Sequence, residues 1–221
     1  MFVGHYGPSF FAKRLAPGIR LWILFLAVQL LDIFWAIFVF LGVERVRIVP
    51  GFTATNALDL YYMPYTHSLP GALAWAAAAA IFYRLMTGSR REAALVGAGV
   101  FSHWPLDLLV HRPDLALYDN TAKMGLGLWD YPYVTLILEG ALLLGAMGLY
   151  LQKSRPLTSG GRYSMPVFCL AILLMQAGML FSPPPPSDRV MAATALIAYA
   201  LLAAVIAWVE RGRATRGRDS R

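Results

Sequence analysis

The chain has 221 residues, of which 58% are hydrophobic and only 14% are charged. An ordinary soluble domain carries about 25% charged residues, and a mean hydropathy of +0.57 leaves too few polar side chains to cover a soluble surface. The composition therefore excludes a soluble domain and predicts an integral membrane protein. The net charge of +7 does not indicate nucleic-acid binding, because the basic residues form short clusters between apolar runs instead of one basic face with interleaved aromatics.

Apolar segments long enough to cross a membrane, which takes about 20 residues, recur along the chain. We expect spans over residues 19–43, 68–86, 93–111, 131–152, 165–182 and 190–209. The expected fold class is an all-α polytopic membrane helix bundle of about six transmembrane helices, preceded by a short N-terminal re-entrant or interfacial segment. Residues 1–221 are interpreted as one integral membrane domain that ends in a basic cytoplasmic tail, 210–221.

The distribution of lysine and arginine predicts the orientation, since these residues are enriched in cytoplasmic segments. With the N-terminus inside, the cytoplasmic segments hold fourteen of the nineteen: Lys13, Arg14, Arg20, Arg84, Arg90, Arg91, Lys153, Arg155, Arg162, Arg211, Arg213, Arg216, Arg218 and Arg221. The outer segments, chiefly the loops 44–66 and 112–130, hold the other five: Arg45, Arg47, Arg112, Lys123 and Arg189. Both termini are therefore expected in the cytoplasm.

Ionisable residues inside the apolar spans are costly and usually functional. Asp32, Asp107 and Glu139 lie in three different spans. At about 1.5 Å of rise per residue, each is placed about 20 Å from the cytoplasmic end of its span. We therefore expect these three carboxylates at one depth, in the outer half of the membrane.

Histidines accompany these carboxylates. His103, Asp107 and His111 are spaced by four residues and so share one face of a helix, while His67 lies at the outer end of the preceding span. Imidazole nitrogen and carboxylate oxygen suit a divalent metal, with zinc preferred. Glu139 is the candidate proton acceptor, and Arg112, at the outer rim, is the candidate ligand for a substrate phosphate.

Four short motifs resemble those of a family of bacterial inner-membrane proteins, the membrane-bound metal-dependent hydrolases. They are Gly4-His5-Tyr6-Gly7, Leu31-Asp32, Tyr65-Thr66-His67-Ser68 and Ser102-His103-Trp104-Pro105-Leu106-Asp107. Their histidine and aspartate order is similar to that of zinc-dependent phospholipases C. The resemblance covers roughly the first 140 residues and implies a bacterial inner-membrane protein with His5, Asp32, His67, His103 and Asp107 as metal ligands; spacing adds His111.

Three functions are open at this stage. The first is a metal-dependent hydrolase that acts on a phosphoester or lipid-like substrate near the outer leaflet, with Asp32 and Glu139 serving catalysis. The second is a proton-coupled transporter or permease that uses the buried His, Asp and Glu side chains as a relay. The third is a structural membrane subunit in which the same groups only lock the helices together.

Overall fold

The computed structural model describes residues 1–215, and these residues are mainly helical. The helices are η1 (Val3–His5), α1 (Tyr6–Leu15), α2 (Leu21–Val28), α3 (Leu30–Phe40), α4 (Leu69–Thr87), α5 (Arg90–Val110), η2 (Leu128–Asp130), α6 (Pro132–Gln152), α7 (Ser159–Met179) and α8 (Asp188–Arg211). Short strands pair in antiparallel fashion as β1 (Arg45–Ile48) with β2 (Leu58–Tyr62), β3 (Leu115–Tyr118) with β4 (Thr121–Met124), and β5 (Ser154–Pro156) with β6 (Arg213–Thr215).

Within the described residues, five helices, α4 to α8, are long and apolar enough to cross a membrane, and the bent pair α2 and α3 makes a sixth span if counted as one. The expected all-α bundle of about six spans is confirmed. The observed bounds lie close to the expected ones for α4, α5, α6 and α8. Helix α7 begins earlier than the expected residue 165, because the Thr158 hydroxyl caps its first turn by accepting from the Gly161 N–H at 3.0 Å.

The first span differs from the expected continuous helix over 19–43. It breaks at Gln29 into α2 and α3, whose axes differ by 54°. Neither proline nor glycine stands at the break, so the usual sequence signals of a kink are missing there. Instead, the Gln29 side chain is buried and the Val28 carbonyl, at the end of α2, turns to a partner on α5.

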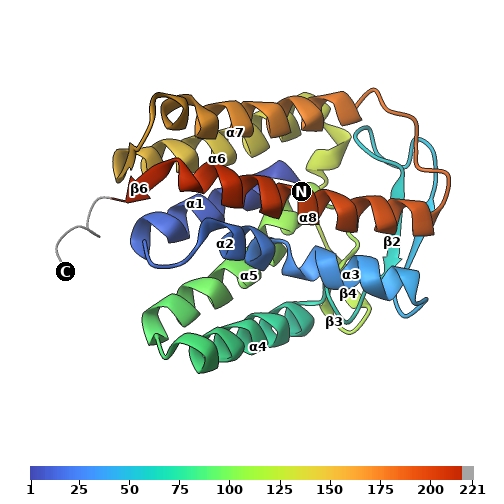
Figure 1. The fold of residues 1–221 in the computed structure, drawn as a ribbon. Coiled ribbons are helices and arrows are strands. Elements are labelled where there is room, and N and C mark those ends of the chain that lie inside the picture. The colour runs from blue at the N-terminus through green and yellow to red at the C-terminus, as the bar shows by residue number, and fades with distance from the viewer. Residues whose placement is uncertain (216–221) are drawn as a thin grey trace.

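The helices run between two different ends of the molecule (Figure 1). At one end, which we call the basic end, lie the α4–α5 turn at Gly88, the α6–α7 connection and the β5–β6 pair. At the other, the hairpin end, lie the β1–β2 and β3–β4 pairs, which fold the segments expected as plain loops over 44–66 and 112–130. These hairpins cover the part of the bundle that carries the polar residues described below.

The N-terminal segment enters the bundle. Its 3₁₀ turn η1 and helix α1 pack against α6, α2 and α5, with His5, Tyr6 and Phe10 buried. Gly7 permits this close approach, since a Cβ there would lie 2.9 Å from the Leu142 carbonyl oxygen. Helix α1 has ten residues, about 15 Å of length, so it reaches only part of the way through the bundle and fits the expected re-entrant segment.

The expected tail over 210–221 is partly structured. Glu210 belongs to α8 and forms an ion pair with the buried Lys13 ammonium group, 2.6 Å from Nζ to Oε1. Its other oxygen accepts from the Leu21 N–H at 2.8 Å. Lys13 also donates to the carbonyls of Pro17 and Ile19, so this pair joins the first and last helices at the basic end. The expected tail residues 216–221 lie outside the described part of the chain.

Replacing Lys13 by Met is expected to destabilise the protein by about 3 kcal/mol, because the Glu210 carboxylate is left without its partner in a largely buried position. The melting temperature in detergent measures the change. Lys13→Met combined with Glu210→Leu should recover much of the loss. Arg84→Met, which removes an exposed cation at the same end, is the matched control, and an equal loss in that variant would contradict the role given to the ion pair.

Candidate metal centre

Five ionisable side chains meet below the hairpin end; they come from α5, from α3 and from the residue before the cap of α4. His103, Asp107 and His111 follow one face of α5, as their spacing predicts, with His111 capping its C-terminus. Asp32 comes from the first turn of α3, and His67 comes just before the Ser68 cap of α4. All are buried except Asp32, whose side chain is 15% exposed.

The Asp107 carboxylate lies at the middle of this cluster. Its Oδ2 atom is 3.0 Å from His103 Nε2, 3.5 Å from His111 Nε2 and 3.7 Å from His67 Nε2. The Asp32 Oδ1 atom lies 3.3 Å from His67 Nε2 and 3.4 Å from His103 Nε2. Three imidazole nitrogens of the same kind, Nε2, therefore face Asp107, and those of His67 and His103 also face Asp32.

The tautomer of His103 is fixed by the break in the first span. Its Nδ1 lies 2.7 Å from the Val28 carbonyl oxygen, at the end of α2. A carbonyl only accepts hydrogen bonds, so Nδ1 carries the proton in the neutral ring and Nε2 carries the lone pair. Nε2 is buried and has no hydrogen-bond partner, although it lies among carboxylates.

The tautomer of His67 is fixed by a chain of two polar residues. The Thr66 hydroxyl lies 2.6 Å from the buried Glu44 carboxylate, to which it donates, and 2.7 Å from His67 Nδ1. Since the hydroxyl has one proton and donates it to Glu44, it accepts a hydrogen bond from Nδ1–H of His67. Glu44 is held in turn by the backbone N–H groups of Tyr65 and Thr66. His67 Nε2 is again left with the lone pair.

His111 has a carboxylate partner that the sequence analysis missed. Its Nδ1 lies 2.7 Å from Asp114 Oδ1 in the turn after α5, so Nδ1–H donates and Nε2 carries the lone pair. A histidine whose second ring nitrogen donates to a carboxylate or carbonyl is the usual arrangement of a metal ligand. The three-residue spacing from His111 to Asp114 suggested that the two side chains could be close. The sequence does not show that they point toward each other.

The donor set fits a divalent metal ion. Lone pairs of three Nε2 atoms and two carboxylates converge, with separations mostly longer than good hydrogen bonds of about 2.7–3.2 Å. Ligand atoms about 2.1 Å from a tetrahedral zinc ion are about 3.4 Å apart, close to the 3.0–3.7 Å separations measured from Asp32 and Asp107 to His67 and His103. Two groups, Asp32–His67–His103 and His5–His103–Asp107, could hold such an ion.

His5 reaches the same cluster from the N-terminal segment. Its ring stacks on that of His103, with centroids 3.7 Å apart, and its Nε2 lies 3.1 Å from Asp107 Oδ1. Its Nδ1 is buried and has no hydrogen-bond partner. The Met1 amino group lies 2.6 Å from the same oxygen. His5 thus contacts the opposite carboxylate oxygen from the other three histidines, and its second nitrogen lacks the orienting partner that they have.

Glu139, expected at the same depth, is buried and holds the N-terminal segment in place. Its Oε2 atom accepts from the backbone N–H groups of Phe2 and Gly4, at 2.8 and 3.0 Å. Its Oε1 atom accepts from the Gln176 amide of α7 at 3.3 Å. Glu139 lines the cavity beside the cluster, so it has both a structural contact and access to that space.

Arg112 does not join the cluster. Its guanidinium group donates to the Phe52 carbonyl at 2.7 Å and lies 3.3 Å from Asp130, at an exposed position. It therefore connects the segment before α6 to the loop that holds Phe52, and it does not line the cavity. The sequence placed it correctly beside His111, but the direction of the side chain after the helix end was not predictable.

The last two spans, which the sequence analysis treated only as hydrophobic helices, contribute polar contacts. Tyr199 of α8 donates its hydroxyl proton to Asp32 Oδ2 at 2.9 Å, which leaves Oδ1 facing the histidines. Gln176 of α7 contacts Glu139, and its own Oε1 atom is buried without a partner. Both residues are single polar groups in apolar runs, and this is the signal that could have identified them.

A cavity of about 660 Å³ opens beside the cluster, between α7, α8 and the β1–β2 hairpin. Asp32, His67, Asp107, His111 and Glu139 line it at the polar side. Most other lining residues are apolar, among them Leu58, Leu60, Met63, Met175, Met179, Pro183, Pro184, Val190, Met191, Ala195 and Ala198. The site is therefore buried in the bundle but connected to a space large enough for a small ligand.

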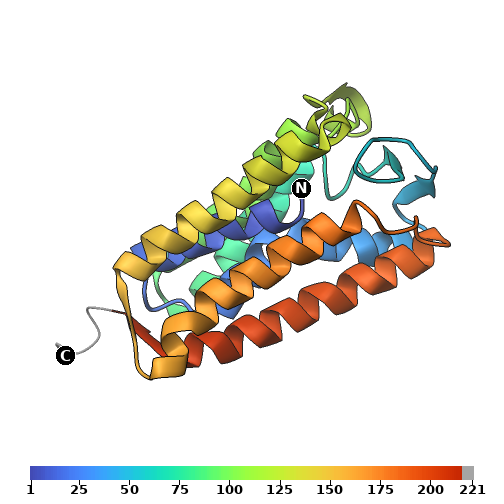
Figure 2. The ribbon, with the colours of Figure 1, turned by 90° about the horizontal axis from the view of Figure 1, so that it is seen from above.

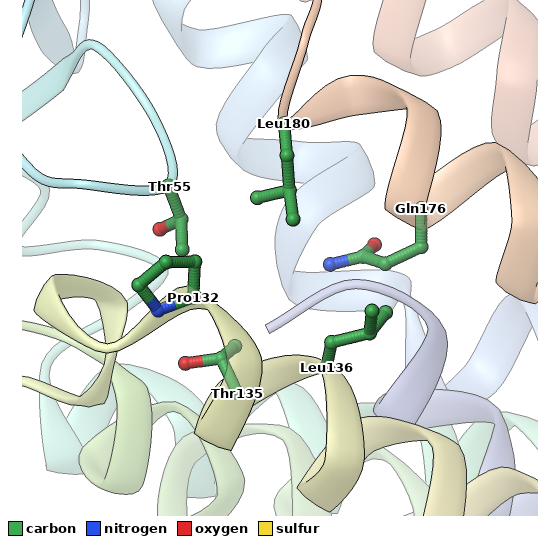
Figure 3. A pocket seen from close by; sticks show the side chains of 6 residues that line it. All are labelled: Thr55, Pro132, Thr135, Leu136, Gln176 and Leu180. Carbon is green, nitrogen blue, oxygen red and sulfur yellow. The ribbon is translucent and has the colours of Figure 1, made fainter.

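A second, much smaller pocket of about 10 Å³ lies next to the cavity, with Thr55 and Pro132 on one side and Gln176 and Leu180 on the other (Figure 3). Thr55, Gln176 and Leu180 line both spaces. Its volume suits about one water molecule. It lies over the first turns of α6, close to the Gln176 amide that contacts Glu139.

Compared with protein-family models, with curated proteins and with solved structures, the chain has no match in any of the three.

Asp114→Asn is expected to weaken the binding of a divalent metal by about 10- to 100-fold, because the carboxylate that orients His111 is lost. Zinc titration against a competing chelator, with the protein in detergent, measures the affinity. Asp130→Asn removes a carboxylate that contacts Arg112 instead of a histidine and serves as the control. Equal affinities in wild type and Asp114→Asn would show that His111 is not a ligand.

Proposed function

We propose that the protein is a membrane-embedded metal-dependent hydrolase that acts on a phosphoester or lipid-like substrate. The observation that carries this proposal is the set of three Nε2 lone pairs, on His67, His103 and His111, directed at the Asp32 and Asp107 carboxylates. Imidazole lone pairs and carboxylates so arranged repel one another, and a divalent cation held between them would remove that repulsion. The resemblance to membrane-bound metal-dependent hydrolases supports the same conclusion.

Zinc is the ion we favour. Imidazole and carboxylate ligands without a thiolate suit it, and tetrahedral separations of about 3.4 Å fit its bond lengths. A harder ion such as Mg²⁺ prefers six oxygen ligands in octahedral geometry, which the histidines do not supply. Because His103 has one lone pair on Nε2, the two candidate groups that include it share a single ion at that nitrogen.

Asp32, Asp107 and the three histidines would hold the divalent ion, which when bound would supply a water that ionises near neutral pH for ester hydrolysis. The chain's own groups would then act in three ways. Asp32 and Asp107 would offset the charge of the ion, Tyr199 would keep Asp32 oriented, and Glu139 would accept the proton of the attacking water. Glu139 Oε1 accepts one weak hydrogen bond from Gln176 and so retains lone-pair capacity for that proton.

The location of the protein follows from the same proposal. We infer that it lies in a bacterial inner membrane with the basic end cytoplasmic, because lysine and arginine favour that end as the cytoplasmic side. The Met1 amino group is buried at Asp107, so the N-terminal segment is re-entrant and the expected cytoplasmic N-terminus is not kept. The hairpin end would then face outward, and the cluster beneath it would act near the outer leaflet. The cavity, bounded by apolar side chains of α7 and α8, supports a substrate that has apolar parts.

The metal content of the purified protein is the direct test. Wild type is expected to carry about one equivalent of zinc by elemental analysis, and His103→Ala or Asp107→Ala should lose at least nine tenths of it. Ester hydrolysis by wild type in vesicles should disappear on chelation and return with added zinc. Glu139→Gln is expected to keep the metal and lose activity by about 10²- to 10⁴-fold.

Gln152→Ala, at the basic end of α6, is the control, and it should keep both metal and activity. A wild-type protein that carries no stoichiometric metal would refute the hydrolase. Proton-coupled solute flux through the metal-free protein, abolished by His103→Ala, would then favour the permease. Loss of folded protein alone in the same variants would favour the structural subunit.

A further inference from the structure

The cavity beside the cluster has one polar side, and the rest of its lining is mostly apolar. The polar side is formed by Asp32, His67, Asp107, His111 and Glu139. The opposite side is formed by methionine and small or apolar residues of α7 and α8. Figure 2 shows α6 and α7 diverging from the basic end, with the N-terminus between the helices on the wider side. A ligand that fills this space would carry its polar group at one end only.

The volume limits the size of that ligand. A cavity of about 660 Å³ lies within the range of about 300–1,000 Å³ that encloses one drug-sized ligand. The space therefore suits one hydrocarbon chain with a compact head. Two long chains of a membrane lipid would exceed it.

The charges limit the head group. Among the described residues, the cavity is lined by Asp32, Asp107 and Glu139 but by no lysine or arginine. Arg112, the expected phosphate ligand, instead contacts Phe52 and Asp130. The Met1 amino group also lines the cavity, but it is paired with Asp107 at 2.6 Å. A phosphomonoester with two negative charges would therefore lie against Glu139 without a lysine or arginine to match its charge. A phosphodiester, with one negative charge, meets less repulsion there.

Small residues define the width of the apolar part. Ala195 and Ala198 lie on the cavity side of α8, next to Tyr199, and both are partly exposed to the cavity. Met175 and Met179 line it from α7; their flexible side chains adapt to an apolar ligand. A larger side chain at position 195 or 198 would occupy the space that a chain needs.

We propose that this cavity binds an amphiphile with a single hydrocarbon chain and a phosphodiester head, with the head at the His/Asp cluster and the chain between α7 and α8. Ala195 and Ala198 are then specificity-determining residues, because they leave room for the chain. The assignment rests on the proposed hydrolase, whose substrate class it narrows. Binding of the chain does not itself need the metal.

Photolabelling tests the assignment. The probe is a lysophosphatidylcholine with a diazirine at the end of its one chain, in phosphatidylcholine vesicles that contain the protein. After illumination, mass spectrometry is expected to find label on Met175, Met179 and the Ala195–Ala198 turn at least tenfold above the lipid-facing residues Ile81 and Phe82 of α4. Equal labelling of both surfaces would overturn the proposal.

Variants and related probes sharpen the result. Ala198→Phe is expected to lower cavity labelling about tenfold and leave the metal content unchanged, while Ala200→Phe, exposed on the same helix, should label as wild type does. Undiminished labelling of Ala198→Phe would contradict the proposal.

Related probes carry the same diazirine chain on a different head or with a second chain. A two-chain phosphatidylcholine should label the cavity several-fold less, and equal labelling would refute the single chain. An alkyl phosphate should also label it several-fold less, and equal labelling would refute the phosphodiester head.

Two further outcomes separate this inference from the proposed hydrolase. His103→Ala is expected to lose the metal and to keep labelling within about twofold, because the chain contacts remain. Wild-type protein that carries no metal but is labelled in the cavity would count against the hydrolase and support the chain site. Wild-type protein that carries the metal but is labelled equally on all helices would support the metal centre and overturn the chain site. Excess glycerophosphocholine, the head without a chain, should not displace the probe, and full displacement would contradict a chain site.

Discussion

The proposed metal centre depends on one constraint. Three imidazole lone pairs and two carboxylates are directed at one small volume inside an apolar bundle. Each histidine is held from behind: His103 by the Val28 carbonyl, His67 by Thr66 and His111 by Asp114. The break of the first span has a direct consequence here, because the carbonyl that ends α2 is the one that fixes His103. Such convergence suits a divalent cation, which would accept the lone pairs and offset the charge of the carboxylates.

The rest of the fold brings distant segments to this point. The N-terminal segment inserts between α5 and α6, places His5 against His103 and is held there by Glu139. Helix α8 supplies Tyr199 to Asp32 at one level and Glu210 to Lys13 at another. The cavity then joins the polar cluster to an apolar space between the last two helices. A metal-dependent hydrolase of amphiphiles would need both the polar cluster and the apolar cavity, whereas a purely structural role for the cluster does not explain the cavity.

The sequence predicted the spans well because the length of an apolar run and the charges at its ends are local properties. It also predicted that Asp32, His67, His103, Asp107 and His111 meet. The depth of a residue follows from the rise per residue of its helix, and a spacing of four residues places side chains on one helix face. The sequence could not predict the 54° bend at Gln29, which follows from tertiary contacts and has no proline or glycine. The roles of Asp114, Thr66, Glu44 and Tyr199 were missed because they depend on side-chain direction. The contacts of Arg112 with Phe52 and Asp130 could not be predicted for the same reason.

X-ray absorption at the zinc edge of metal-loaded wild-type protein tests the central claim most directly. About four nitrogen and oxygen ligands at about 2.0–2.1 Å are expected, with the multiple-scattering signature of two or three imidazoles, and His103→Ala treated in the same way should give almost no zinc signal because it loses the metal. A shell of oxygen ligands alone, or an unchanged zinc signal in that variant, would contradict the metal centre.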